Sequence, residues 1–265
     1  MAKKLPSSLD YLRPVVADDL VRFGSAADGG YLLPQHLLGD IDAALSFGLA
    51  TDWSFEEQLA RLRPGIPIHV YDHTVGAKSY YRSAKSRSLK WLSGRTSFED
   101  VRMRWKTYTG YRRFFSGRHR HYAERVFNRR DNPNDATLDI AFSRLGDVHH
   151  VLLKVDIEGS EYRIVPAINS FADRIDLLAI EFHDTDPFRP IFEAQIRSLL
   201  DHFVIVHLHA NNITGVAEDG LPDAVEITFM NKRHRISEQR RDRLPLAGLD
   251  QPNDPKRPDY ELIFM

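Results

Sequence analysis

The chain has 265 residues, of which 42% are hydrophobic and 28% charged, and it contains no cysteine. The absence of cysteine excludes disulfides, thiolate zinc sites and a cysteine nucleophile. The formal net charge of −1 gives the molecule as a whole no electrostatic case for binding nucleic acid. The length suits one α/β domain, with or without an insertion.

The N-terminal residues, Met-Ala-Lys-Lys-Leu-Pro, lack the apolar core of a secretory signal. No stretch approaches the ~20 apolar residues of a membrane span. We therefore expect a cytoplasmic protein with neither a membrane nor nucleic acid as a partner. We interpret residues 1–265 as one domain, with 1–40 as an N-terminal extension and 76–133 as a helical insertion or lid.

A tight turn is predicted at Asp28 and Gly29, between two apolar stretches. Asp-Gly in this setting is a strong hairpin signal. The hairpin is interpreted either as a cover over the edge of the domain or as one wall of a ligand cleft.

The first strand of the expected sheet covers residues 42–48, and a loop and a helix follow it. Ser54 with Glu57 three residues later has the pattern of a capping box at the start of that helix. A strand, a loop with Gly48 and a helix aim the helix N-terminal amides at whatever lies over the strand end. A loop with one glycine is weak support for a cofactor site by itself.

A second strand is predicted at residues 67–71, and it ends in Asp72 and His73. In a Rossmann-like sheet, an acidic residue at the end of the second strand accepts hydrogen bonds from ribose hydroxyls. Asp72 follows Gly48 at about the ~20-residue spacing that this arrangement needs. The same geometry would suit NAD, so it does not by itself identify the cofactor.

Residues 76–133 are rich in arginine, lysine and aromatic residues. This mixture suits an acidic, sugar-like or nucleic-acid partner, and equally two amphipathic helices with solvated basic faces, which is the more common case. Helices are predicted near 76–93 and 97–107, and a strand near 122–127. Asp135 is then predicted as the N-cap of a helix that ends at Leu145.

Residues 151–155 form a short apolar run, interrupted by Lys154 and followed directly by acidic residues. Such a run is typical of a strand buried on both faces of a parallel sheet. Ligands bind open α/β sheets at the carboxyl ends of the strands, so Asp156 and Glu158 are candidate site residues. The alternative is a solvated turn before the next helix, and Glu161 is interpreted as a residue that supports this turn.

Further strands are predicted at 175–182, 203–209 and 224–230. Alternating strands and helices predict a doubly wound, mostly parallel α/β sheet. That topology would bring together the polar residues at the strand ends, namely Gly48, Asp72, Asp156 with Glu158, Glu181 with His183, and His209 with Asn211.

These groups suit two kinds of chemistry. His183 or His209, held by a carboxylate, could act as a general base near neutral pH. Carboxylates could instead hold a hard divalent metal such as Mg²⁺, although the spacing fits no standard metal motif.

Residues 154–162, KVDIEGSEY, resemble the L-K-[IV]-D-[IV]-E-G-[SA]-E-[YW] signature of FkbM-like methyltransferases, a branch of the class I enzymes that use S-adenosylmethionine (SAM). The resemblance extends over about residues 20–265, through six further short stretches at 28–31, 46–48, 52–56, 71–74, 181–183 and 222–228.

The resemblance implies a Rossmann-like sheet of seven strands and SAM-dependent O-methylation of a hydroxyl on a sugar, glycan or other small metabolite. The cofactor-binding residues that we then expect are Gly48, Asp52, Asp72, His73 and Asp135. The residues expected to bind the acceptor and supply the base are Asp156, Glu158, His183 and His209. A divalent metal as a further cofactor stays open.

Two other classes of protein remain as alternatives. An NAD-dependent oxidoreductase would share the fold and Asp72, but it should carry G-x-G-x-x-G, which the sequence lacks. A non-catalytic Rossmann-like module that has lost its cofactor is the other alternative, and the single glycine of the loop after the first strand is its best support.

Overall fold

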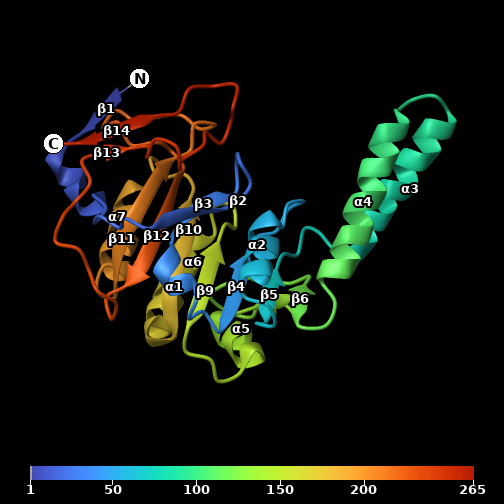
Figure 1. Cartoon of the computed structure of the whole chain (residues 1–265), viewed down its shortest axis with the longest axis horizontal. Coiled ribbons are helices and arrows are strands. Elements are labelled where there is room, and N and C mark those ends of the chain that lie inside the picture. Colours follow the sequence, from blue (N-terminus) through green and yellow to red (C-terminus); the bar gives the residue numbers. More distant parts are fainter. Residues whose placement is uncertain (1) are drawn as a thin grey trace.

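The structure is a computed structural model that describes residues 2–265. Its central sheet has seven strands, which are β4 (Ala43–Phe47), β5 (Ile68–Tyr71), β6 (His119–Tyr122), β9 (Val151–Val155), β10 (Ile175–Phe182), β11 (Phe203–Ala210) and β12 (Val225–Asn231). Their order across the sheet is β11-β12-β10-β9-β4-β5-β6 (Figure 1). β12 is antiparallel to both neighbours, and the other adjacent pairs are parallel. The predicted doubly wound, mostly parallel α/β sheet of seven strands is confirmed.

The helices are α1 (Gln35–Leu38), α2 (Ser54–Leu62), α3 (Ala77–Leu92), α4 (Phe98–Phe114), α5 (Leu138–Leu145), α6 (Glu161–Ser170) and α7 (Arg189–Leu199). All except α3 and α4 pack against the faces of the sheet (Figure 1). Two short 3₁₀ helices, η1 (Ser7–Leu12) and η2 (Ala172–Arg174), complete the helical elements. Buried residues of α5, α6 and α7 belong to one hydrophobic cluster, and those of α1 and α2 belong to a second cluster on the opposite face.

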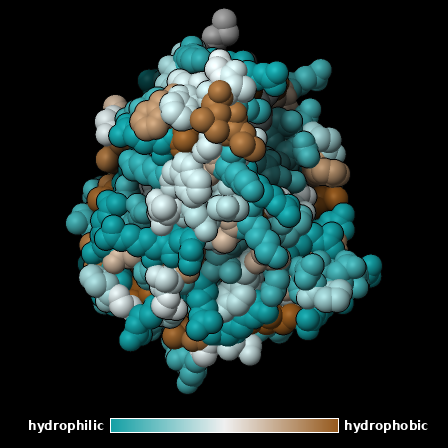
Figure 2. Space-filling view, turned by 90° about the vertical axis from the view of Figure 1, so that its right-hand side faces the viewer, coloured by the Kyte–Doolittle hydropathy of each residue, from teal (hydrophilic) through white to brown (hydrophobic). Residues whose placement is uncertain are grey.

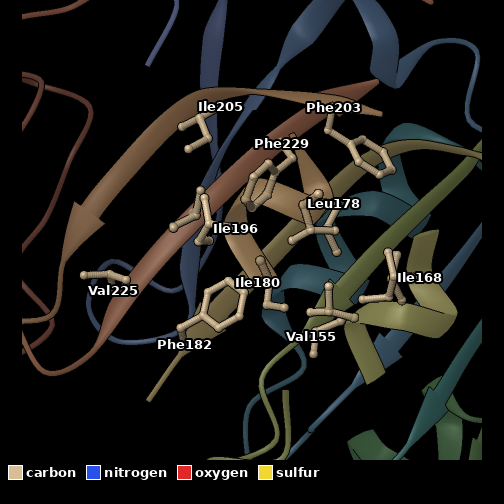
Figure 3. Close-up of a cluster of buried hydrophobic side chains, with 14 of the residues drawn as sticks. Val155, Ile168, Leu178, Ile180, Phe182, Ile196, Phe203, Ile205, Val225 and Phe229 are labelled. Atoms are coloured by element: carbon tan, nitrogen blue, oxygen red, sulfur yellow. The ribbon is translucent and has the colours of Figure 1, made fainter. Parts of the chain in front are cut away.

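The strands form because their sequences are apolar enough to be buried on both faces. Every residue of β9 and β10 is buried, as expected for strands inside a parallel sheet. Figure 3 shows Val155 of β9, Leu178 and Ile180 of β10 and Phe229 of β12 meeting in one cluster. This packing fixes the carboxyl ends of β4, β5, β9 and β10 at one edge of the sheet.

The remaining strands are short and lie outside the central sheet. A hairpin of β2 (Leu20–Gly24) and β3 (Gly30–Pro34) confirms the turn predicted at Asp28 and Gly29. β1 (Ala2–Leu5), β14 (Glu261–Phe264) and β13 (Arg243–Leu244) form a three-stranded sheet, and β7 (Arg125–Val126) pairs with β8 (Asp135–Ala136). None of the helices formed by residues 2–265 combines the length and apolar character needed to cross a bilayer.

Two predicted helix caps are wrong. The N-cap of α2 is Trp53, and the Ser54 amide donates to Oδ1 of Asp52 at 2.8 Å in place of a capping box with Glu57. Helix α5 is capped by Thr137, whose hydroxyl accepts from the Ile140 amide at 3.4 Å. Asp135, the predicted cap, lies two residues before Thr137, and its side chain pairs instead with Arg125 at 3.0 Å.

The predicted helices of the basic segment are confirmed as α3 and α4, and α4 continues seven residues beyond the expected end at 107. The two helices form a hairpin that projects from the body of the molecule (Figure 1). α4 is longer because Tyr111 packs its ring against Trp53 and Tyr80 at the base of the hairpin, with centroid distances of 6.0 and 4.8 Å. The strand expected near 122–127 is divided between β6 and β7.

Candidate active site

A cavity of about 290 Å³ lies at the carboxyl ends of β4, β5 and β9. Six of the predicted site residues line this cavity, namely Gly48, Asp52, Asp72, His73, Asp156 and Glu158. The structure therefore brings most of the predicted strand-end residues around one space.

Gly48 directly follows β4 and lies against the residue that follows β9. Its φ of +91° lies in the left-handed region, and an added Cβ would overlap the backbone carbonyl oxygen of Asp156. Only glycine meets both conditions without strain. The loop after β4 therefore lies directly against the turn after β9.

Asp72 holds that loop in place. Its Oδ2 accepts hydrogen bonds from the Leu49 and Ala50 amides at 2.9 and 3.0 Å. Its Oδ1 accepts from the amide and the hydroxyl of Thr74 at 2.7 and 2.6 Å. Burial alone would raise the pKa of Asp72, but these hydrogen bonds outweigh it and lower the pKa. The carboxylate is thus ionised, and each oxygen already has two donors.

Asp135 lies apart from the other predicted cofactor residues. Among residues 2–265 it is not one of those that line the cavity, whereas its partner Arg125 is. The Arg125 guanidinium contacts both oxygens of Asp135, at 3.0 and 3.2 Å, and lowers the pKa of that carboxyl to about 2. In this structure Asp135 positions Arg125 at the cavity wall.

Lys154 is a functional candidate that the sequence reasoning missed. Its side chain is 8% exposed, lines the cavity, and places Nζ 3.6 Å from Oδ2 of Asp156 and 5.7 Å from the ring centroid of Tyr31. Burial would lower the pKa of Lys154, but Asp156, Glu56 and Glu181 outweigh it and raise the pKa. The signal was present in the sequence, since a lysine inside a fully buried strand needs a charged partner.

His183 lies beside the turn that follows β9. Its Nδ1 is 3.0 Å from Oε1 of Glu161, and its Nε2 is 3.6 Å from Glu158 and 3.9 Å from Glu181. Burial lowers the pKa of His183, but the hydrogen bond to Glu161 and the charge of Glu181 raise it to about 9. An ionised carboxylate only accepts hydrogen bonds, so Nδ1 carries a proton and Nε2 is the nitrogen that can exchange one.

Glu161 supports the turn, as the sequence predicted. It is fully buried, and its Oε1 accepts from the amides of Ile157 and Gly159 at 3.1 and 3.2 Å as well as facing His183. The same carboxylate oxygen therefore fixes both the backbone that carries Glu158 and the orientation of the His183 ring.

His209 was predicted to lie at the site, but within the described chain it does not line the cavity, and it is 2% exposed. Its Nδ1 lies 3.1 Å from Glu226 and its Nε2 lies 2.9 Å from Asp259. Burial lowers the pKa of His209, but these two carboxylates raise it to about 10. Both ring nitrogens are occupied, so His209 is placed as a buried cation and not as a free base.

A second group of carboxylates was also missed. Asp28, Glu181 and Glu226 present oxygens within 4.8 Å of one another, and Asn253 donates to Asp28 and Glu226 at 2.9 and 2.7 Å. Burial, together with Glu226 and Asp156, raises the pKa of Glu181 well above its usual range. The predicted Asn211 does reach this group, because its amide donates to Glu181 at 2.8 Å.

The donor atoms of Asp156, Glu158 and His183 also lie within 4.8 Å of one another. Lys154 already places a positive charge beside Asp156, however. The predicted divalent metal therefore stays a prediction, and the roles assigned below do not depend on it.

No family model matches the chain, and no curated protein matches it. Among solved structures, similarity is found to a proposed RNA methyltransferase from Pyrococcus horikoshii, with 14% identity, a TM-score of 0.36, and 74% of this chain and 81% of that chain covered. A proposed methyltransferase from Thermoplasma acidophilum has 10% identity and a TM-score of 0.35, with 72% and 68% covered. Precorrin-6Y C5,15-methyltransferase from Geobacter metallireducens has 12% identity and a TM-score of 0.34, with 72% and 80% covered.

The sheet itself defines the chain as an α/β protein with a Rossmann-like fold. The FkbM-like resemblance stays a prediction from the sequence.

Proposed function

We propose that the protein is a SAM-dependent methyltransferase that methylates a hydroxyl on a sugar, glycan or other small metabolite. The observation that carries this proposal is the charge of the cavity. Seven acidic residues line it within the described chain, against two basic ones, Arg125 and Lys154. Arg125 is engaged by Asp135, and Glu124 is engaged by Arg144, so six acidic residues and Lys154 determine the charge of the cavity.

This charge distinguishes between adenosine-containing cofactors. A cavity with excess negative charge attracts a cationic ligand and repels the diphosphate of NAD. When bound, SAM supplies an electrophilic methyl group on a positively charged sulfonium. A volume of about 290 Å³ lies near the lower limit of pockets that hold such molecules, about 300 Å³.

The chain's residues fit the parts of such a site. Gly48 lets the loop after β4 approach closely, and Asp72 keeps the amides of Leu49 and Ala50 ordered at the end of the second parallel strand. In this kind of sheet that position faces the ribose of a bound nucleotide. A ribose would share or replace the donors that Asp72 now accepts.

Asp156 and Glu158 stand at the acceptor side, where their oxygens can accept hydrogen bonds from hydroxyl groups. We assign the role of base to His183, which within the described chain does not line the cavity itself but lies behind Glu158. Glu161 holds its Nδ1 and leaves Nε2 toward Glu158, which does line the cavity. With a pKa of about 9, His183 is protonated at neutral pH in the unliganded protein. It loses that proton more easily when a cation binds in the neighbouring cavity. His183 would then take the proton of the acceptor hydroxyl.

A non-catalytic binding module is the second candidate. One observation favours it, because both oxygens of Asp72 are occupied by protein donors in this structure. Such a module would bind S-adenosylhomocysteine weakly or not at all and would release none of it from SAM.

Thermal unfolding with SAM, S-adenosylhomocysteine and NAD tests the proposal. A ligand at about 100 times its dissociation constant adds about 2.7 kcal/mol to the stability of the folded state. We expect stabilisation by the two adenosyl-sulfur ligands and none by NAD. Asp72→Asn should abolish it, whereas Asp147→Asn, at a side chain 94% exposed, should not. Stabilisation by NAD alone, or by none of the three, would refute the assignment.

A further inference from the structure

The hairpin of α3 and α4 carries a charge that the composition of the whole chain conceals. Residues 77–115 contain eleven lysines and arginines against two acidic residues, Glu99 and Asp100, which gives a net charge of +9. Since the chain as a whole has a charge of −1, the rest of the molecule has a charge of −10. The expectation of no nucleic-acid partner rested on the total charge, which does not describe this hairpin.

The tip of the hairpin is apolar and exposed. Near the end of α3, Leu89, Trp91 and Leu92 are 59%, 44% and 74% exposed, and Phe98 at the start of α4 is 60% exposed. Trp91 and Phe98 lie side by side, with ring centroids 5.7 Å apart. Figure 2, which views this side of the molecule, shows a small hydrophobic patch surrounded by hydrophilic side chains. Large apolar side chains gathered at a protruding point mark an interaction site.

Positive charge surrounds this tip. A groove beside it on α3 is lined by Leu89 and by four basic side chains, Arg82, Lys85, Lys90 and Arg95. All four are exposed, as is Arg104 of α4, whereas Arg102 pairs with Glu99 at 2.7 Å. A groove of this composition suits the phosphate of an anionic headgroup next to an apolar chain.

We propose that the hairpin binds the surface of an anionic lipid bilayer, with Leu89, Trp91, Leu92 and Phe98 inserted and the basic side chains at the headgroups. Tryptophan, leucine and phenylalanine with flanking lysine and arginine are the composition of interfacial membrane segments. Basic residues near a bilayer are attracted by its anionic lipids. Nucleic acid would use the cations and the rings, but two exposed leucines have no stacking or hydrogen-bonding role there.

The hairpin is fixed to the cavity, so binding would orient the site. α3 begins three residues after Thr74, which lines the cavity. The Tyr80 hydroxyl donates to the Ala50 carbonyl, and Trp53 packs against Tyr80 with centroids 6.1 Å apart. The 17 residues of α4 span about 25 Å. The bound protein would therefore hold the cavity at roughly this distance from the bilayer.

Vesicle flotation tests this inference on the full chain, independently of the proposed methyl transfer. Vesicles of phosphatidylcholine alone are compared with vesicles of equal parts phosphatidylcholine and phosphatidylglycerol, at low and high salt. We expect binding to the anionic vesicles only, weakened by salt. Lys90→Glu should weaken it about fivefold or more, and Leu92→Ser about tenfold. Lys256→Glu and Leu62→Ser, exposed residues outside the hairpin, should bind as the unaltered protein does.

Trp91 gives a second readout, since brominated lipid should quench its fluorescence if it enters the bilayer. Absence of binding to anionic vesicles would overturn the proposal. Binding that Leu92→Ser leaves unchanged would also overturn it. So would tighter binding to single-stranded RNA than to anionic vesicles, which would assign the hairpin to nucleic acid.

Discussion

Gly48 lies against Asp156 so closely that position 48 has no room for a side chain, because an added Cβ would overlap the Asp156 carbonyl oxygen. The amide of Asp156 in turn donates to the carbonyl of Phe47 at 2.8 Å. The ends of β4 and β9 are thus joined backbone to backbone, and the cavity opens at this junction.

Gly48→Ala should therefore damage both the stability and the ligand site. Overpacking of this kind costs about 1–3 kcal/mol, and the left-handed φ of +91° adds strain. Urea unfolding measures the loss, and calorimetric titration with S-adenosylhomocysteine measures binding, which we expect to weaken at least tenfold. Gly39→Ala is the matched control, since Gly39 has a φ of −66° and nothing within 4 Å of an added Cβ. Equal behaviour of the two variants would contradict the assigned role of Gly48.

The strands could be predicted from the sequence because their burial leaves a local signal. β9 is apolar apart from Lys154, and β10 is apolar apart from Asp176 and Glu181. Asp72 and Asp156 directly follow β5 and β9. In a parallel sheet, residues that follow strands fall at one edge, so topology alone was enough to group them.

The rest of the site depends on register, which the sequence does not display. Glu226 lies inside β12, and the antiparallel pairing places it opposite Glu181 on one side and opposite His209 on the other. That pairing explains the missed carboxylate group and the wrong placement of His209. Asp28 reaches the same group from the β2–β3 turn through Asn253, a contact between residues 225 positions apart.

Lys154→Met should destabilise the protein, because it removes the cation beside Asp156 while keeping a similar volume. Loss of one partner of a buried ion pair costs about 3–5 kcal/mol. The double variant Lys154→Met with Asp156→Asn should recover part of the loss, since the charge of Asp156 is removed together with that of Lys154. Urea unfolding of the two single variants and the double variant gives the coupling free energy. Strictly additive effects would show that the 3.6 Å pair does not act as a unit.

We expect substitution by glutamine to affect the reaction rate at His183 and the stability of the folded protein at His209. His183→Gln removes the proposed base and should slow methyl transfer about 100-fold or more, as general bases contribute. His209→Gln leaves Glu226 and Asp259 without their cation, so it should lower the free energy of unfolding while leaving the rate unchanged in folded protein. Release of S-adenosylhomocysteine with polyhydroxyl acceptors measures the rate. A large rate loss confined to His209→Gln would reverse the assignment.

The pH dependence of stability tests the environment of His183 without any acceptor. Its folded-state pKa of about 9 lies above the ordinary 6.5. Glu161 and Glu181 therefore stabilise the folded protein fully below pH 6.5, and this contribution is lost as the pH rises through about 9.

The unaltered protein should accordingly exceed His183→Gln in stability by on the order of 2 kcal/mol below pH 6.5, and the difference should shrink above pH 9. Urea unfolding at both ends of this range measures it. His209, with a pKa of about 10, titrates in both proteins and cancels from the difference. A difference that grows with pH would mean that burial, which favours the neutral ring, outweighs the two carboxylates.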